Sequence, residues 1–228
     1  MKDSGVTGMI NVGCDGPSSV RSVELAQRYD FIWAAVGSHP DDADRVDGER
    51  LALYARLCEN ERVKAVGEIG LDYHYEDIPR EVQKNAFRLQ MELARQVKLP
   101  VIVHEREAHA DAMAILEDFP DVTGVFHCYS GSLEMAKELV RRGWYIGFTG
   151  VLTFRNARKA VETAQGLPLE RLLIETDCPY MTPEPYRGRR NDPSYVPLTA
   201  AKLAELRGIT VEQAAQATAQ NAKRLFRL

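Results

Sequence analysis

The sequence predicts an α/β fold, a TIM-type (β/α) barrel that lacks its first strand, and three observations support this class. Short apolar runs alternate with amphipathic stretches along the 228 residues, which is the pattern of parallel strands connected by helices. No Gly-x-Gly-x-x-Gly motif follows the first apolar run, which disfavours a dinucleotide-binding sheet. Only seven strands are predicted, whereas a closed barrel ordinarily has eight.

The elements follow from apolar periodicity and from Gly, Pro and capping residues. Strands are predicted at residues 6–12, 31–36, 63–67, 101–103, 122–126, 144–148 and 172–174. Helices are predicted at residues 18–29, 48–59, 80–98, 108–117, 133–142, 157–165, 198–206 and 211–226. Thr210 and Gln213 fit a capping box for the last helix. Residues 1–5 resemble a helix end with a glycine cap, so a strand and most of its helix are expected to be missing before them.

Length and composition favour a single domain over residues 1–228. The net charge is −4 at pH 7, so the protein as a whole is not basic. A nucleic-acid partner would therefore need a local patch of basic residues. No run reaches the ~18 apolar residues of a membrane span. Four widely spaced cysteines without a Cys-x-x-Cys pair indicate reduced thiols. We therefore predict a cytoplasmic protein with no membrane association and no obligate protein partner.

Metal-binding side chains follow several predicted strands. Carboxyl ends of parallel strands share one face of a barrel, so these side chains should converge there. A mixed set of carboxylates and imidazoles suits one or two divalent ions, such as Mg, Mn or Zn. The predicted metal ligands are Glu68, His104, His127 and Asp177. Of these, the carboxylate residues Glu68 and Asp177 are also the predicted catalytic residues.

Other polar residues near these strand ends have less certain roles. Glu175 is expected to point away from the barrel axis and to hydrogen-bond a ligand histidine. His39, before Pro40, fits a substrate contact and a structural turn residue equally well. His74 and His109 lie beyond the strand ends and are interpreted as structural. No nucleophile-elbow sequence supports a Ser-His-Asp triad.

A local basic patch follows Asp177, consisting of Arg187, Arg189 and Arg190. Guanidinium groups suit phosphate oxygens. The flanking tyrosines, which have rings that can stack on bases, are Tyr180, Tyr186 and Tyr195. Arg106 is a further candidate for a phosphate contact, while a solvated loop is the alternative for the patch.

Five motifs in order resemble the TatD family of metal-dependent deoxyribonucleases. They are Gly-Glu-Ile-Gly-Leu-Asp-Tyr (67–73), His-Glu-Arg-Glu-Ala (104–108), His-Cys-Tyr-Ser-Gly (127–131), Glu-Thr-Asp-Cys-Pro-Tyr (175–180) and Arg-Gly-Arg-Arg-Asn-Asp-Pro (187–193). The resemblance implies a TIM barrel that hydrolyses DNA, as single strands or at ends, with divalent metals. It implies that Glu68 bridges two metals and that His104 and His127 complete one site. It also implies that Asp177 binds metal and activates water, with Glu175 behind the ligands.

The sequence departs from the family at its start, because it contains no His-x-His pair. In the family this pair supplies two ligands to the first metal, so the chain is expected to be N-terminally shortened. Two alternatives to a deoxyribonuclease remain open. One is a catalytically impaired or non-catalytic binding protein, and the other is a related hydrolase of esters or amides, such as an aminoacyl-tRNA or a lactone.

Overall fold

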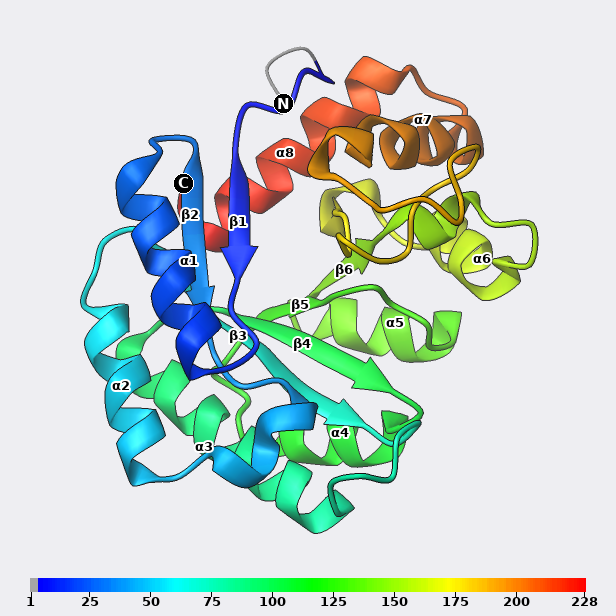
Figure 1. Ribbon diagram of the computed structural model, residues 1–228. Helices are drawn as coiled ribbons and strands as arrows, with labels where there is room; N and C mark the ends of the chain where they lie inside the picture. Colours follow the sequence, from blue (N-terminus) through cyan, green and yellow to red (C-terminus); the bar gives the residue numbers. More distant parts are fainter. Residues whose placement is uncertain (1–3) are drawn as a thin grey trace. The chain divides into compact units, whose positions relative to one another are not determined.

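The computed structural model describes residues 4–228 and has the predicted α/β class, with strands and helices alternating along the chain (Figure 1). The seven strands follow one another in chain order in a single sheet. The pairs β1–β2, β2–β3, β3–β4 and β6–β7 are parallel. The strands are β1 (Met9–Val12), β2 (Ile32–Val36), β3 (Val63–Asp72), β4 (Val101–Arg106), β5 (Gly124–Phe126), β6 (Tyr145–Phe148) and β7 (Leu172–Ile174).

All eight predicted α-helices are present, and short 3-10 helices were not predicted. The α-helices are α1 (Gly16–Arg28), α2 (Gly48–Cys58), α3 (Arg80–Val97), α4 (His109–Glu117), α5 (Leu133–Arg141), α6 (Arg158–Gly166), α7 (Val196–Arg207) and α8 (Val211–Phe226). The 3-10 helices are η2 (Pro40–Arg45), η3 (Gly150–Thr153), η4 (Leu169–Arg171) and η5 (Pro193–Tyr195). The capping box predicted at Thr210 and Gln213 is confirmed. None of the helices in the described part of the chain is long and apolar enough to cross a membrane.

The strands β3 and β4 are longer than predicted, and this corrects the placement of two candidate residues. The apolar runs end near Gly67 and Val103, but the ladder continues as far as the pair Asp72–Arg106. Glu68 therefore lies within β3, and the prediction that it follows a strand ending at residue 67 is wrong. Gly70 permits the continuation, because its φ is +142° and a Cβ there would lie 1.9 Å from the His104 carbonyl oxygen.

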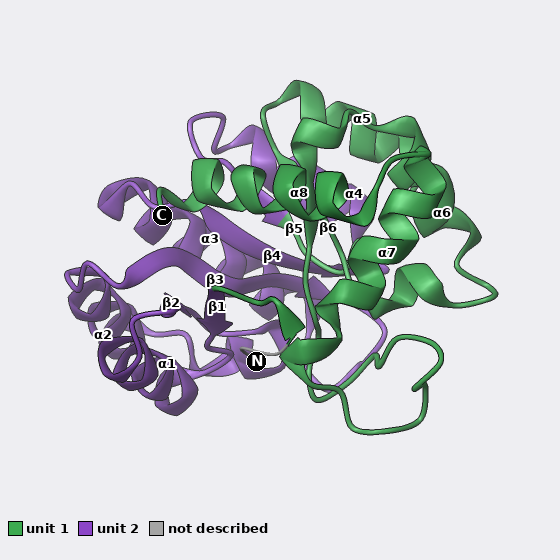
Figure 2. Cartoon of the chain, turned by 90° about the horizontal axis from the view of Figure 1, so that it is seen from above, with its two compact units in different colours: residues 1–7, 126–228 green, residues 8–125 purple. Residues whose placement is uncertain are grey.

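The chain divides into two compact units, coloured separately in Figure 2: unit 1 comprises residues 1–7 and 126–228, and unit 2 comprises residues 8–125. The helix end predicted at residues 1–5 lies partly outside the described residues, although Gly5 has the positive φ of 76° that suits a cap. The single domain and the missing first strand stay predictions.

Unit 2 is built on strands that are buried almost throughout. Ala34, Val66, Leu71 and Val103 are completely buried, as expected for a parallel sheet covered by helices. Helix α1 packs against β2, and α3 packs against β3. The carboxyl ends of β2, β3 and β4 are thereby fixed relative to one another.

Unit 1 holds its last strand through the C-terminal helix. Helix α8 packs against both α7 and β7. Asn221 Nδ2 in α8 donates hydrogen bonds of 2.8 Å to the carbonyls of Leu169 and Leu172. Because Asn221 is buried, these bonds fix the start of β7, the strand that leads to Glu175 and Asp177.

Candidate metal centre

Glu68 and His104 lie on the neighbouring strands β3 and β4 of unit 2, and their side chains meet. The distance from Glu68 Oε1 to His104 Nδ1 is 3.0 Å. Each side chain is 18% exposed, so the pair is largely shielded but still reachable from solvent. The structure thus brings together two of the four predicted metal ligands.

Asp72, at the end of β3, determines which nitrogen of His104 carries a proton. Its Oδ2 lies 3.0 Å from His104 Nε2, and its Oδ1 accepts the His74 N–H at 2.9 Å. Burial alone would raise the pKa of Asp72, but the hydrogen bonds from His104 and His74 lower it below its usual range. An ionised carboxylate only accepts, so His104 Nε2 carries a proton that it donates to Asp72, and Nδ1 faces Glu68.

The contact between Glu68 Oε1 and His104 Nδ1 needs either a proton or a metal ion between the two atoms. A nitrogen lone pair and a carboxylate oxygen repel each other at 3.0 Å unless a proton or a metal ion lies against both. Imidazole nitrogen and carboxylate oxygen are ordinary ligands of divalent metals. Two atoms at this separation can both bond one ion at about 2.1 Å. The residues present therefore fit a divalent metal ion.

His39 lies beside this pair but presents a donor to it. One ligand atom each from His39, Glu68 and His104 lie within 4.8 Å of one another. His39 Nδ1, however, accepts the Asp41 N–H at 3.2 Å, so a neutral ring carries its proton on Nε2. That Nε2 is 3.8 Å from Glu68 Oε1. A protonated nitrogen does not ligate a metal, so His39 suits a hydrogen bond to a substrate oxygen.

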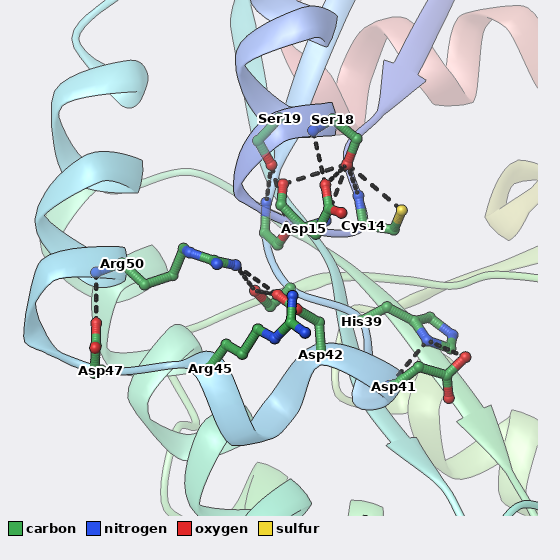
Figure 3. Close-up of polar contacts among 12 residues, drawn as sticks. Cys14, Asp15, Ser18, Ser19, His39, Asp41, Asp42, Arg45, Asp47 and Arg50 are labelled. Atoms are coloured by element: carbon green, nitrogen blue, oxygen red, sulfur yellow. Dashed lines mark hydrogen bonds and ion pairs between the residues drawn. The ribbon is translucent and has the colours of Figure 1, made fainter.

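His39 is also the N-cap of η2, and a polar network behind it holds this segment (Figure 3). The Asp42 carboxylate pairs with Arg50 of α2 and accepts the Ser38 hydroxyl at 2.9 Å. Ser38 Oγ lies 2.7 Å from the hydroxyl of Tyr54, which is completely buried. Because Asp42, Arg50 and Tyr54 all belong to helices, this network fixes the position of His39.

Two buried glutamines of helix α3 hydrogen-bond the backbone of Ser38 and Asp72, near the ends of β2 and β3. These glutamines were not identified from the sequence. Gln83 accepts from the Asp72 N–H and donates to the Asp72 carbonyl, both at 2.9 Å. Gln90 accepts from the Ser38 N–H at 2.7 Å and donates to the Ser38 carbonyl at 3.0 Å. The two glutamines are seven residues apart and lie on one face of the helix. They hold the backbone next to His39 and beneath His104.

Replacing Gln90 with alanine is expected to lower the free energy of unfolding by about 3 kcal/mol, because the buried N–H and C=O of Ser38 lose their partners. Urea denaturation of the wild type and of Gln90→Ala measures this difference in the free energy of unfolding. Gln96→Ala is the matched control on the exposed face of α3, with an expected change below about 0.5 kcal/mol. Equal losses in the two variants would contradict this role of Gln90.

In unit 1, Glu175 lies against His127. The Glu175 Oε1 atom is 3.7 Å from His127 Nδ1 and accepts the Cys128 N–H at 2.6 Å. Gly147 of β6 leaves room for it, since a Cβ there would lie 2.7 Å from the same oxygen. This arrangement supports the interpretation that Glu175 positions a ligand histidine from behind.

Asp177 follows β7, and Cys128 follows β5. Asp177 is half-buried, and its carbonyl accepts the Tyr180 N–H at 2.7 Å. Burial raises the pKa of the Cys128 thiol to about 11, and its sulfur lies 3.3 Å from Thr149 Oγ1. A protonated thiol is a poor metal ligand.

Three of the four predicted phosphate-binding arginines lie over aromatic rings. Arg106, at the end of β4 in unit 2, has its guanidinium carbon 5.3 Å from the Tyr75 ring centroid. In unit 1, Arg187 lies 4.3 Å from Phe154 and Arg189 lies 5.4 Å from Tyr186. Arg187, Arg189 and Arg190 are exposed, and cation–π contact leaves the N–H edges of the two stacked arginines available for anions.

His74 and His109, which the sequence analysis interprets as structural, each contact a glutamate. His74 Nδ1 is 2.9 Å from Glu107 Oε1, and His109 Nδ1 contacts the buried Glu105 carboxylate. Glu105 also accepts the Ala108 N–H at 2.7 Å at the start of α4. These contacts fit a role in holding the β4–α4 connection.

The chain is similar to known proteins over nearly its whole length. The model of the family "TatD related DNase" matches residues 1–227. The uncharacterized metal-dependent hydrolase YabD of Bacillus subtilis is 47% identical over 96% of this chain and 87% of the relative. The 3'-5' ssDNA/RNA exonuclease TatD of Erwinia tasmaniensis is 35% identical over 100% of this chain and 91% of the relative. The crystal structure of YJJV, a TatD homologue of Escherichia coli, superposes with a TM-score of 0.92 and 34% identity, covering 99% of this chain and 88% of that one. The N-terminal shortening stays a prediction.

Proposed function

Because the chain belongs to the family of TatD-related DNases, we propose that it is a metal-dependent hydrolase that cleaves phosphodiester bonds of single-stranded DNA. The observation that carries the proposal is the Glu68–His104 contact, in which a carboxylate oxygen and an imidazole nitrogen, both ordinary ligands of divalent ions, lie 3.0 Å apart. The name of the Erwinia relative supports a single-stranded substrate.

The proposed metal ligands are Glu68, His104, His127 and Asp177. A bound divalent ion neutralises charge on a phosphoryl group and lowers the pKa of a water molecule. The remaining roles belong to side chains. His39 donates its Nε2–H to a phosphoryl oxygen, and Asp177 orients the attacking water and takes its proton. Arg106, Arg187, Arg189 and Arg190 hold neighbouring phosphates, for which guanidinium groups are suited.

The test is the release of nucleotides from single-stranded DNA in the presence of Mn²⁺ or Mg²⁺. The wild type is expected to release nucleotides, and Asp177→Asn is expected to be at least about 100-fold slower, the usual effect of losing a general base. A variant as active as the wild type would contradict the role of Asp177. A wild type that releases nothing with either metal would contradict the hydrolase itself.

A binding protein without turnover is the second candidate. It predicts that single-stranded DNA binds with metal present but stays intact. A panel of ester and amide substrates tests the third possibility, and hydrolysis of one of these without cleavage of DNA would favour it.

A further inference from the structure

The loop that follows β7 carries three tyrosines, and the structure separates their roles. The rings of Tyr186 and Tyr195 stack on each other, with centroids 5.0 Å apart and an interplanar angle of 19°. The Arg189 guanidinium also lies over the Tyr186 ring, at 5.4 Å. These two rings are therefore engaged within the loop.

Tyr180 instead projects into solvent. It is 70% exposed, the largest exposed fraction among the exposed large hydrophobic side chains of residues 4–228. The next residue, Met181, is 44% exposed and has a φ of +54°, a conformation that is strained for a side chain of this size. Strained backbone next to exposed apolar groups is more typical of binding sites than of inert loops.

The backbone beneath Tyr180 is held rigidly. Its N–H donates to the Asp177 carbonyl at 2.7 Å, and its own carbonyl accepts Asn191 Nδ2 at 2.6 Å. The Asn191 N–H donates to the Pro179 carbonyl at 3.0 Å, and Asn191 is buried. The ring is thus presented on a fixed support, so a ligand that contacts it has little loop entropy to overcome.

The same loop also carries positive charge, which suits the phosphates of a nucleic acid. Arg187, Arg189 and Arg190 are all exposed, and guanidinium groups recognise phosphate oxygens. An aromatic face stacks on a nucleobase of any sequence, provided that the base is unpaired. A phosphate-binding edge combined with an aromatic platform suits a single strand rather than a duplex.

We infer that Tyr180 is a stacking platform for a nucleobase of a single-stranded nucleic acid whose phosphates contact the arginines of this loop. The inference rests on the proposed function for the identity of the substrate. It adds a base-contacting subsite and assigns it to Tyr180, in preference to Tyr186 and Tyr195.

The experiment measures binding of two labelled decamers by fluorescence anisotropy, with EDTA present so that no strand is cleaved. One is dT10 and the other is a decamer of abasic deoxyribose phosphates. Tyr180→Ala is expected to bind dT10 about tenfold more weakly, in line with about 1–3 kcal/mol for one stacked base. Its affinity for the abasic decamer should equal that of the wild type, and Tyr180→Phe should match the wild type on both.

Tyr29→Ala removes a tyrosine that is 37% exposed in unit 2 and serves as the control, with no change expected on either decamer. Undiminished binding of dT10 by Tyr180→Ala, or equal weakening on both decamers, would overturn the stacking contact. Cleavage of dT10 by the wild type in Mn²⁺ is scored separately. Weaker binding of dT10 by Tyr180→Ala without any cleavage by the wild type would support the platform and overturn the hydrolase proposal. Cleavage by the wild type together with undiminished binding of dT10 by Tyr180→Ala would support the hydrolase and overturn the platform.

Discussion

Replacing Glu68 with glutamine is expected to lower the affinity for Mn²⁺ by at least about 100-fold, since even residues behind metal ligands contribute 10–100-fold. The rate of DNA hydrolysis should fall by at least the same factor. The stability of the metal-free protein should not fall. The new amide NH₂ can donate to His104 Nδ1, which removes the repulsion that Glu68 Oε1 creates at 3.0 Å. Isothermal titration with Mn²⁺ and thermal denaturation in EDTA measure the two effects.

His39→Asn is the matched comparison for this variant. Asparagine retains an acceptor for the Asp41 N–H and is a favourable N-cap, so η2 should stay folded. If His39 donates to substrate, Mn²⁺ affinity stays within about threefold, while kcat/KM for DNA falls at least about tenfold, the effect of one hydrogen bond to a charged group. A loss of metal affinity as large as that of Glu68→Gln would instead make His39 a metal ligand.

Local sequence was sufficient to predict the seven strands, because each is a short apolar run between helices. It was not sufficient for their ends. The ladder between β3 and β4 continues through Gly70 and Asp72, where the apolar pattern has already stopped. Pairing with a neighbour distant in sequence decides this extension, so a pattern confined to one strand does not reveal it.

The candidate site was partly predictable for a related reason. Glu68 and His104 were identified because both follow apolar runs of buried strands. The glutamines of α3 were missed, although Gln83 and Gln90 interrupt the buried face that Phe87 and Met91 continue. A polar residue on an otherwise buried helix face indicates a specific hydrogen-bond partner. The identity of that partner, and the tautomer of each histidine, depend on tertiary contacts.

Replacing Asp72 with asparagine is expected to lower Mn²⁺ affinity by about 10–100-fold without removing any metal ligand. Asp72 Oδ1 accepts the His74 N–H at 2.9 Å, so the asparagine oxygen should keep that position. Its NH₂ then occupies the position of Oδ2, 3.0 Å from His104 Nε2. Two donors cannot face each other, so Nε2 becomes an acceptor and the proton of a neutral ring moves to Nδ1, where the metal would bind.

Long-range ¹H–¹⁵N NMR spectra of the histidines distinguish this mechanism from a general loss of structure. His104 Nε2 should be protonated in the wild type and unprotonated in Asp72→Asn, with the signals assigned from a His104→Gln sample. Asp111→Asn is the control, because Asp111 accepts a hydrogen bond from Tyr73 at 2.6 Å on the same unit and lies on α4. A variant that keeps a protonated Nε2 together with wild-type metal affinity would show that Asp72 does not set the tautomer. A shift of the proton with unchanged metal affinity would show instead that His104 Nδ1 is not a ligand, because the proton and the ion compete for the same lone pair.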